Sequence, residues 1–412
     1  MLINVPRGMN IPVEGQPEQK VHAAPATDRV AILGLDYPSL HPSLAVAEGD
    51  AVLKGQTLFA DRKAPAICVT APAAGRVIEI NRGPRRSVVS IVIAPSGDAT
   101  QKFPTHADAH LPSLDREALR ATLLASGLWA GFRVRPGAAV PPANSLPKEI
   151  FVTAMDTEPL APAPEIAISD AAEDFARGLA VLSRLADTSV YLCAAPNTSI
   201  PLPDLANLKA VRFAGPHPAG LPGTHMHYLR RRACARSDRW QVGYQDVIAM
   251  GHLLATGELP DHRVVALAGS GARKPRLLRV RTGVDLSGLL KNETHPDSRI
   301  ISGSVLTGRT TNPATRYLGR FHNQITVLAN ANSFPATTGM LAVEAFERVW
   351  PFDTPPLPLL RALLIQDTET AEALGCLDLE AEDLALCSYV CPARLDYGRA
   401  LEETHAAIAR LG

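Results

Sequence analysis

The amino-acid sequence predicts a multidomain α+β protein. The chain has 412 residues, more than one hydrophobic core usually organises. Short apolar stretches between turn residues fill the first hundred positions. Strand and helix patterns alternate after them, and helical patterns fill the end. These observations predict four parts, at residues 1–100, 101–270, 271–335 and 336–412.

The first part, residues 1–100, is expected to be a small β module. Brief apolar runs lie at Ile67 to Pro72, Val77 to Ile80 and Ser87 to Ile93, with glycine- and proline-containing turns between them. Such spacing is typical of short, half-buried strands.

The second part, residues 101–270, is expected to be an α/β layer. Ile150 to Ala154 and Val190 to Ala194 have the composition of buried strands. Between them a helix would place one apolar face inward, formed by Phe175, Leu179, Leu182 and Ala186. Asp170 with Glu173 predicts a capping box at its start. Strand-helix-strand order implies a parallel sheet. Further elements are expected at Leu114 to Leu128 (helix), Tyr244 to Leu254 (helix) and Val264 to Leu267 (strand).

The third part is expected to be β-rich and the fourth helical. From Arg276, glycines separate short strands that end with Gln324 to Leu328. Apolar residues then recur at helical spacing in two segments, which Pro351 to Pro358 separate. They are Met340, Val343, Phe346, Val349 and Trp350 in the first segment, and Tyr397, Leu401, Thr404, Ile408 and Leu411 in the second.

Composition excludes several classes of protein. Lys and Arg number 41, as do Asp and Glu, and this balance argues against a general nucleic-acid binder. No apolar run approaches 18 residues, so no transmembrane helix is expected, and no apolar h-region follows the first ten residues. Six cysteines in this length do not form a disulfide framework, which favours reduced thiols in a cytoplasmic protein.

One glycine motif suggests a dinucleotide-binding loop, and we reject it. Gly269 and Gly271 follow the strand at 264–267, but Lys274 occupies the position of the third glycine. Pro275 then precedes a strand pattern, not the helix whose N-terminus would meet a pyrophosphate. We expect a plain loop.

Cysteine spacing also fails to predict a cofactor. Cys387 and Cys391 are separated by three residues, with Cys376 upstream. A bacterial iron–sulfur pattern needs two intervening residues and a fourth thiolate. We interpret these cysteines as packing thiols, and a redox sensitivity of Cys387 and Cys391 stays open as a hypothesis.

Two clusters of basic side chains are candidates for binding sites. His225 and His227 would share one face of a strand, but only His217 is near enough in sequence to add a third ligand, so we interpret them as structural. The second cluster comprises Arg230 to Arg232, Arg236 and Arg239. A solvated face and docking to an acidic subunit or anionic lipid both stay open for it. No metal site is predicted.

No catalytic residue is predicted either. The sequence contains no nucleophile elbow of the G-x-S-x-G type, no Walker loop and no H-E-x-x-H motif.

A family resemblance runs through nearly the whole chain. It is carried by Gly8 to Gly15, Thr70 to Gly75, Glu79 to Gly83, Val152 to Thr157, Gly215 to His225, Ser302 to Gly308, Asp383 to Pro392, and Tyr397 with Gly398. In these segments the sequence resembles the NqrA family, the A subunits of the sodium-translocating NADH:quinone oxidoreductase. It is distantly similar to the C subunit of Rnf and to the flavin-bearing subunit of complex I.

The resemblance implies a fold for each part. Residues 1–100 would form a barrel-sandwich module of the biotinyl/lipoyl type, and 101–270 a Rossmann-like α/β domain. Residues 271–335 would form a β-grasp (SLBB-like) domain, and 336–412 a helical domain. Carrier relatives bear a modified lysine at a hairpin tip, close to the place of Lys63. We expect no prosthetic group there, and whether Lys63 is modified stays open.

The resemblance also implies a function. The complex would oxidise NADH, reduce ubiquinone and export sodium across the bacterial inner membrane. This chain would be a peripheral subunit on its cytoplasmic side, docked on the B subunit in the membrane. It would bind no cofactor tightly and would be inactive when isolated, since flavins and iron centres belong to partner subunits. The alternative is a self-sufficient flavin and iron–sulfur electron-transfer subunit of the Rnf C type.

The same resemblance points to a quinone-proximal segment. The glycine-rich flavin and NADH loop of the distant relatives is replaced here by Leu128 to Arg133. Bulky side chains at Trp129, Phe132 and Arg133 would crowd a phosphate that glycines let approach the backbone. These three residues are our candidates for contact with ubiquinone, because a quinone needs stacking surface and donors for its carbonyls. An ordinary core role for the two aromatic residues is the alternative.

Overall fold

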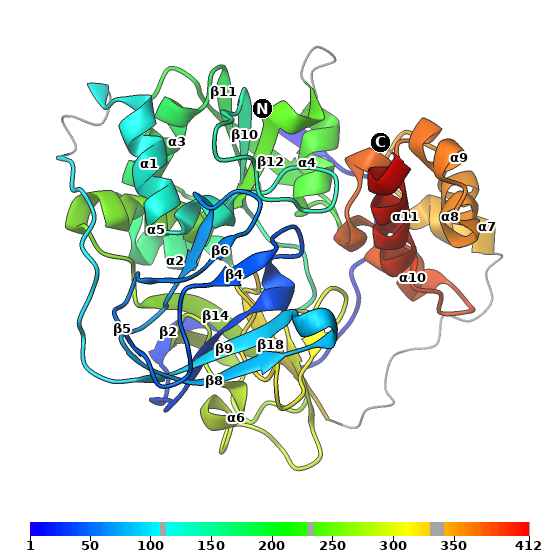
Figure 1. Cartoon of the computed structure of the whole chain (residues 1–412). Coiled ribbons are helices and arrows are strands. Elements are labelled where there is room, and N and C mark those ends of the chain that lie inside the picture. The colour runs from blue at the N-terminus through cyan, green and yellow to red at the C-terminus, as the bar shows by residue number, and fades with distance from the viewer. Residues whose placement is uncertain (108–112, 230–234, 330–341, 412) are drawn as a thin grey trace.

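Four sheets and a separate group of helices make up the protein. The computed structural model describes residues 1–107, 113–229, 235–329 and 342–411. In Figure 1, helices α1, α3 and α5 lie on one side of the molecule, and the orange to red helices α7 to α11 form their own group on the other.

Two small antiparallel sheets form the N-terminal β module. Their strand orders are β3-β9-β8-β5 and β4-β6-β7. The strands are β3 (Val30–Leu33), β4 (Pro42–Leu44), β5 (Ala51–Val52), β6 (Thr57–Asp61), β7 (Cys68–Thr70), β8 (Gly75–Arg82) and β9 (Val88–Pro95). Leu58, Phe59 and Ile91 are fully buried in their core. The expected β module is confirmed.

A five-stranded parallel sheet forms the second part, as the strand-helix-strand pattern predicts. Its order is β1-β12-β11-β10-β13, and every neighbouring pair is parallel. The strands are β1 (Leu2–Asn4), β10 (Glu149–Ala154), β11 (Ser189–Ala194), β12 (Leu208–Ala214) and β13 (Arg239–Gly243). Both faces are covered, which explains why β10 and β11 are apolar along nearly their whole length.

Alternate side chains of β10 enter two different cores. Val152 belongs to the core that holds Leu179 of α3 (Ala172–Leu185), together with α1 (Arg116–Ala125) and α5 (Tyr244–Thr256). Phe151 points to the opposite face and packs in the core that holds Met226 of α4 (Pro222–Leu229). The period of two along a strand produces this division.

The helix predicted after Asp170 exists, but its predicted capping box is wrong. Asp170 is the last residue of α2 (Pro164–Asp170), and α3 begins after Ala171 without any side-chain cap. The Asp170 carboxylate accepts a hydrogen bond from Arg279 at 2.5 Å instead. The expected buried face is confirmed, since Phe175, Leu179 and Leu182 are fully buried.

A pair of alanine substitutions tests this local assignment. Asp115 caps α1, where its carboxylate accepts from the Ala118 amide at 3.0 Å. Replacing Asp115 with alanine should lower the free energy of unfolding by about 1 kcal/mol, the usual cost of a lost N-cap. Replacing Asp170 should cost no more than about 0.5 kcal/mol, because its ion pair with Arg279 is exposed. Urea unfolding followed by circular dichroism measures the free energy of unfolding of both variants. Equal losses would show that Asp170 does cap α3.

A six-stranded mixed sheet forms the third part. Two of its strands, β2 and β14, come from outside residues 271–335. Its order is β17-β16-β18-β14-β15-β2. The strands are β2 (Glu18–Ala23), β14 (His262–Ala268), β15 (Arg276–Arg281), β16 (Arg299–Ser302), β17 (Arg309–Thr310) and β18 (Gln324–Leu328). The strand predicted at 264–267, β14, pairs antiparallel with β15 and is not part of the five-stranded parallel sheet. Because β1, β2 and β14 cross between the expected parts, the fourfold division of the chain stays a prediction.

The segment after β14 is a loop, as expected because Lys274 stands where a dinucleotide-binding motif would have its third glycine. Gly269 has a φ of +104° and lies against Gly15. Residues 269–275 are all described, and no helix forms among them before β15 begins at Arg276. This stretch of the described chain therefore offers no helix N-terminus to a pyrophosphate.

Five α-helices form the C-terminal part of the described chain. They are α7 (Ala342–Val349), α8 (Pro356–Ile365), α9 (Thr368–Ala373), α10 (Ala385–Val390) and α11 (Tyr397–Leu411). They enclose their own core, which includes Phe346, Trp350 and Leu401. Met340 lies outside the described residues, as do the side chains of Val343 and Leu411. Among the helices of the described ranges, none has the length and apolar character needed to cross a bilayer.

Candidate functional site

One cavity lies where the N-terminal β module, the helices of the parallel-sheet part and the six-stranded sheet meet. We call it the junction cavity. It holds about 980 Å³ of space that opens to solvent, and its walls combine apolar with polar and charged side chains. The apolar lining includes Ile32, Val69, Pro72, Leu128, Ala167, Ile248, Ala249 and Leu259. A mixed lining of this kind suits a small organic ligand with an apolar body and a few polar groups.

Polar groups interrupt this apolar wall. Gln245, at the start of α5, donates to the Val264 carbonyl at 2.8 Å and to the Asn323 side chain at 3.0 Å. Arg263 donates from Nη2 to the same Asn323 oxygen at 2.9 Å, while its buried Nε has no hydrogen-bond partner among the described residues. Burial lowers the pKa of Arg263 to about 10, so it stays charged at neutral pH. An unsatisfied donor of this kind can meet a ligand carbonyl.

A buried charge network supports one side of the junction cavity. Asp246 pairs with Arg320, and Asp36 accepts from the Arg320 amide at 2.8 Å and pairs with Arg309. Burial opposes the charge on Arg320, but Asp246, Tyr37 and Asp36 together outweigh it and raise the pKa of Arg320 above its ordinary value. Burial also raises the pKa of Tyr37 to about 12. This network joins the three structural parts around the cavity.

The two aromatic candidates lie in the core next to this cavity. Trp129 and Phe132 are 1% and 0% exposed, and both rings pack against Trp240 with centroids 5.2 and 5.3 Å away. The Trp129 indole donates to the Pro141 carbonyl at 2.9 Å. Of the segment 128–133, Leu128 lines the junction cavity directly. The aromatic pair forms the layer behind that wall.

Arg133 clamps the N-terminal β module to the parallel-sheet part. Its guanidinium donates to the carbonyls of Ala130 at 2.6 Å and Phe132 at 2.8 Å, and reaches the Asp36 carbonyl at 3.0 Å. It also lies 3.9 Å above the Phe321 ring. Burial lowers the pKa of Arg133 to about 10. Contact of these three candidates with ubiquinone stays a prediction.

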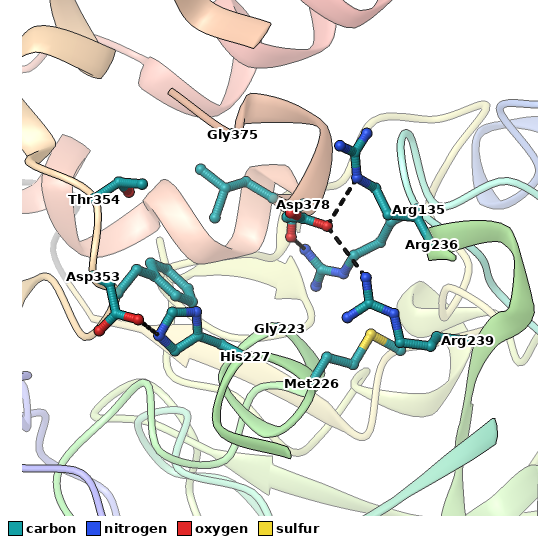
Figure 2. Close-up of a pocket in the computed structure, with 12 residues that line it drawn as sticks. Arg135, Gly223, Met226, His227, Arg236, Arg239, Asp353, Thr354, Gly375 and Asp378 are labelled. Atoms are coloured by element: carbon teal, nitrogen blue, oxygen red, sulfur yellow. Dashed lines mark hydrogen bonds and ion pairs between the residues drawn. The ribbon is translucent and has the colours of Figure 1, made fainter. Parts of the chain in front are cut away.

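The second cavity lies between the parallel-sheet part and the C-terminal helices, and we call it the interdomain cleft (Figure 2). It holds about 650 Å³ of space that opens to solvent. Arg236 and Arg239 both lie beside Asp378 across the cleft, at 3.1 and 3.6 Å. The rest of the predicted basic cluster, Arg230 to Arg232, lies outside the described residues.

The histidine pair does not occupy a strand, so the expected shared face is wrong. His225 and His227 belong to α4, where residues two apart point in widely different directions. His225 is fully buried against Phe213 and bonds the Ala219 carbonyl at 3.0 Å, and burial lowers its pKa to about 3. His227 pairs instead with Asp353 at 3.4 Å. Among the residues that the structure describes, no group of three or more His, Cys, Asp or Glu side chains could hold a metal.

Cys387 and Cys391 lie in the core of the C-terminal helices, 1% and 4% exposed. Cys391 has its sulfur 3.7 Å from the Tyr397 hydroxyl. Cys376, also buried, belongs to the same core. The placement agrees with packing thiols, and the redox role of Cys387 and Cys391 stays a hypothesis.

Cys387 should react slowly with alkylating agents. Burial raises the pKa of its thiol to about 12, and the thiolate is the reactive form. In the native chain at pH 8, iodoacetamide should modify Cys387 at least about tenfold more slowly than in urea. Peptide mass spectrometry measures the two rates. Equal rates would show that the thiol is accessible and would favour the redox hypothesis.

Lys63 is exposed in the hairpin loop between β6 and β7. A hairpin position matches the expectation from carrier modules. Whether Lys63 carries a prosthetic group stays open, and the mass of the intact chain would test it.

Sequence reasoning missed most of the residues that build the junction cavity. Asp36, Asp246, Arg263 and Arg320 come from four segments, and the sequence gives no sign that the two aspartates will be buried and the two arginines half-buried.

Models of one protein family match the chain along most of its length. They are described as the NqrA N-terminal barrel-sandwich hybrid domain, the NqrA second alpha/beta domain and the NQRA C-terminal domain, and they match residues 3–96, 114–259 and 264–312. The first match confirms the expected barrel-sandwich module.

Whole relatives give the same result. The chain is 42% identical to the A subunit of the Na(+)-translocating NADH-quinone reductase of Neisseria meningitidis serogroup B. It is 43% identical to that of Saccharophagus degradans and 42% to that of Histophilus somni, each match covering 100% of both chains.

Similarity to solved structures is weak. A chain of the NAD+-reducing [NiFe]-hydrogenase in the air-oxidized state is 14% identical with a TM-score of 0.41, over 74% of this chain and 66% of that one. A similarity of this size carries no information about function.

Proposed function

The chain belongs to the NqrA family, the A subunits of the Na⁺-translocating NADH-quinone reductase, and on this premise we propose that it holds ubiquinone in the junction cavity. Two features carry the proposal. Apolar residues of the lining would meet the ring and tail of a quinone, and Arg263 has an unsatisfied buried donor that would meet a carbonyl oxygen.

The finer assignments belong to the same proposal. The α/β part would be Rossmann-like, the six-stranded part a β-grasp domain, and the C-terminal helices a domain of their own. The chain would lie on the cytoplasmic side of the inner membrane, docked on the B subunit in the membrane. NADH, flavins and iron centres would be bound by partner subunits, and this chain would serve as a scaffold without a tight cofactor.

Residues 128–133 would support the cavity wall against which the quinone lies. Trp129 and Phe132 support the wall that Leu128 presents, and Arg133 fixes that wall to the N-terminal module through Asp36. Their role would be to shape the cavity, with the contact to quinone made through Leu128.

Equilibrium binding to the full chain tests the site. A short-chain ubiquinone should quench tryptophan emission, since Trp129 lies directly behind the wall. The variant Ala249→Phe fills the cavity and should weaken binding at least about tenfold. Ala255→Phe is the matched control, because Ala255 is exposed on the same helix and does not line the cavity. Equal affinities for both variants would place the quinone elsewhere.

An absorbance spectrum of the chain expressed alone tests the scaffold role. We expect protein absorbance only. Bands of flavin or an iron–sulfur cluster would favour the alternative, a self-sufficient electron-transfer subunit.

A further inference from the structure

We propose that the hairpin between β8 and β9, with two apolar side chains beside it, is a docking surface for a membrane that contains anionic lipids. We call this surface the arginine tip. It comprises Arg82, Arg85 and Arg86 of the hairpin together with Leu35 and Phe321. None of these five residues lines the junction cavity, and the inference does not depend on where a quinone binds.

The hairpin carries three positive charges at its end. Arg82, Arg85 and Arg86 are exposed, and none of them forms an ion pair within the described part of the chain. The Arg82 guanidinium bonds only the Arg86 carbonyl, at 3.2 Å. No Asp or Glu occurs in the sequence from Ile80 to Gly97. Because a guanidinium group stays protonated in proteins, this end of the module attracts anions at any physiological pH.

The carboxylates close to the hairpin already have partners. Glu79, three residues before Arg82 on β8, pairs with Arg29 at 2.5 Å. Asp36 is buried and pairs with Arg309. The whole chain has as many acidic as basic residues, but the hairpin end keeps a local excess of positive charge.

The backbone of the hairpin is held in an unfavourable conformation for two of these arginines. Arg85 and Arg86 have φ angles of +54° and +61°. Left-handed backbone is costly for a residue with a Cβ atom, and glycine would adopt it more easily. Strain of this kind is concentrated in segments that bind or switch. The hairpin therefore presents charged side chains where the turn itself would favour glycine.

An exposed leucine lies at the same end of the sheet. Strands β8 and β9 run side by side (Figure 1), and β3 pairs with β9 up to Leu33, opposite Ser90. Gly34 then packs against the hairpin side of β9, because a Cβ atom added to it would come within 1.9 Å of the Val88 carbonyl oxygen. Leu35 follows directly and is 58% exposed.

Phe321 adds a second apolar group next to this leucine. The amide of Arg320 donates to the Asp36 carboxylate at 2.8 Å, which places Phe321 beside the segment that contains Leu35. Its ring meets the Tyr37 ring edge to face, with centroids 6.4 Å apart, and Phe321 is still 36% exposed. Two exposed apolar side chains next to uncompensated arginines are not needed for solubility.

This combination suits a lipid surface. Apolar side chains can enter the boundary of the acyl chains while arginines meet the phosphates of the headgroups. A nucleic acid would satisfy the arginines but would leave the apolar pair in water. Anionic lipids also supply the surface potential that attracts clustered arginines.

Sedimentation of the full chain with lipid vesicles tests the proposal. At low salt, vesicles with about half phosphatidylglycerol should bind the chain at least about tenfold more tightly than vesicles of phosphatidylcholine alone. Salt at about 0.5 M should release it, because salt screens exposed charges. Equal binding to the two kinds of vesicle would overturn the proposal. So would no binding to either, the result expected if the arginines meet an acidic protein.

Matched triple variants locate the surface. Replacing Arg82, Arg85 and Arg86 together with glutamine should weaken binding to the anionic vesicles about a hundredfold, roughly fivefold for each arginine. The control replaces three exposed arginines of the C-terminal helices, and so changes the net charge equally; they are Arg361, Arg399 and Arg410. If the two triple variants bound equally well, the arginine tip would not be the docking surface.

A new tryptophan tests the contact with the acyl chains. The native tryptophans Trp129, Trp240 and Trp350 are 1%, 0% and 0% exposed, so brominated lipids should not quench them. Leu35→Trp should be quenched on anionic vesicles, and Leu202→Trp, at another exposed leucine, should not. Bound protein in which Leu35→Trp is quenched no more than Leu202→Trp would contradict the proposed orientation.

Discussion

Replacing Arg135 with alanine is expected to lower the free energy of unfolding by about 3–5 kcal/mol. Arg135 joins the parallel-sheet part to the C-terminal helices through Asp383, whose side chain is fully buried. Removing the guanidinium leaves that carboxylate buried without its counter-charge. It also removes the neighbour that partly offsets the effect of burial on Glu380, whose pKa is raised to about 7 mainly by burial.

Urea unfolding measures the loss, and two further variants define its origin. The double variant Arg135→Met with Asp383→Leu removes both charges and should recover a large share of the stability. Arg399→Ala should cost less than about 0.5 kcal/mol, since its pair with Glu403 is exposed. If Arg135→Ala behaved like Arg399→Ala, the link between the two parts would be energetically unimportant.

Gly251→Ala is expected to destabilise the α/β part by about 3 kcal/mol or more, although alanine favours helix over glycine by about 1 kcal/mol. A Cβ on Gly251 of α5 would lie 1.8 Å from the Asp174 carbonyl oxygen and 2.8 Å from the Gly178 amide of α3. Both obstacles are backbone atoms, so the two helices would have to separate.

Thermal unfolding of Gly251→Ala and Gly288→Ala provides the comparison. Gly288, in the short helix α6 (Leu286–Leu289), is exposed, and an added Cβ would meet its nearest atom at 3.4 Å. That variant should be neutral or slightly stabilised. A Gly251→Ala protein as stable as the Gly288→Ala protein would show that α3 and α5 are not packed this closely.

Local elements of the fold were predictable because local pattern determines them. The buried face of α3 and the strands β10 and β11 follow from apolar spacing alone. Capping was mispredicted at Asp170 because a carboxylate near a helix start can serve a distant partner equally well, here Arg279. The pairing of β1, β2 and β14 with distant strands depends on tertiary contacts, which periodicity does not encode.

The sequence indicated the segment next to the candidate site but not the residues that line the cavity. The segment 128–133 does border the junction cavity, but through Leu128, while the more conspicuous Trp129 and Phe132 fill the core. Large aromatic side chains have most to gain from burial, so a bulky residue in sequence favours a core position over a cavity wall. Arg263 could not be recognised, since its role depends on the meeting of three sheets.

Steady-state ubiquinone reduction by the whole complex, carrying this chain with Ala249→Phe, tests the central claim most directly. If the junction cavity holds the quinone, the KM for ubiquinone rises about tenfold or more, the KM for NADH does not change, and a complex with Ala255→Phe behaves as the unaltered one. An unchanged KM for ubiquinone in a fully assembled Ala249→Phe complex would contradict the account.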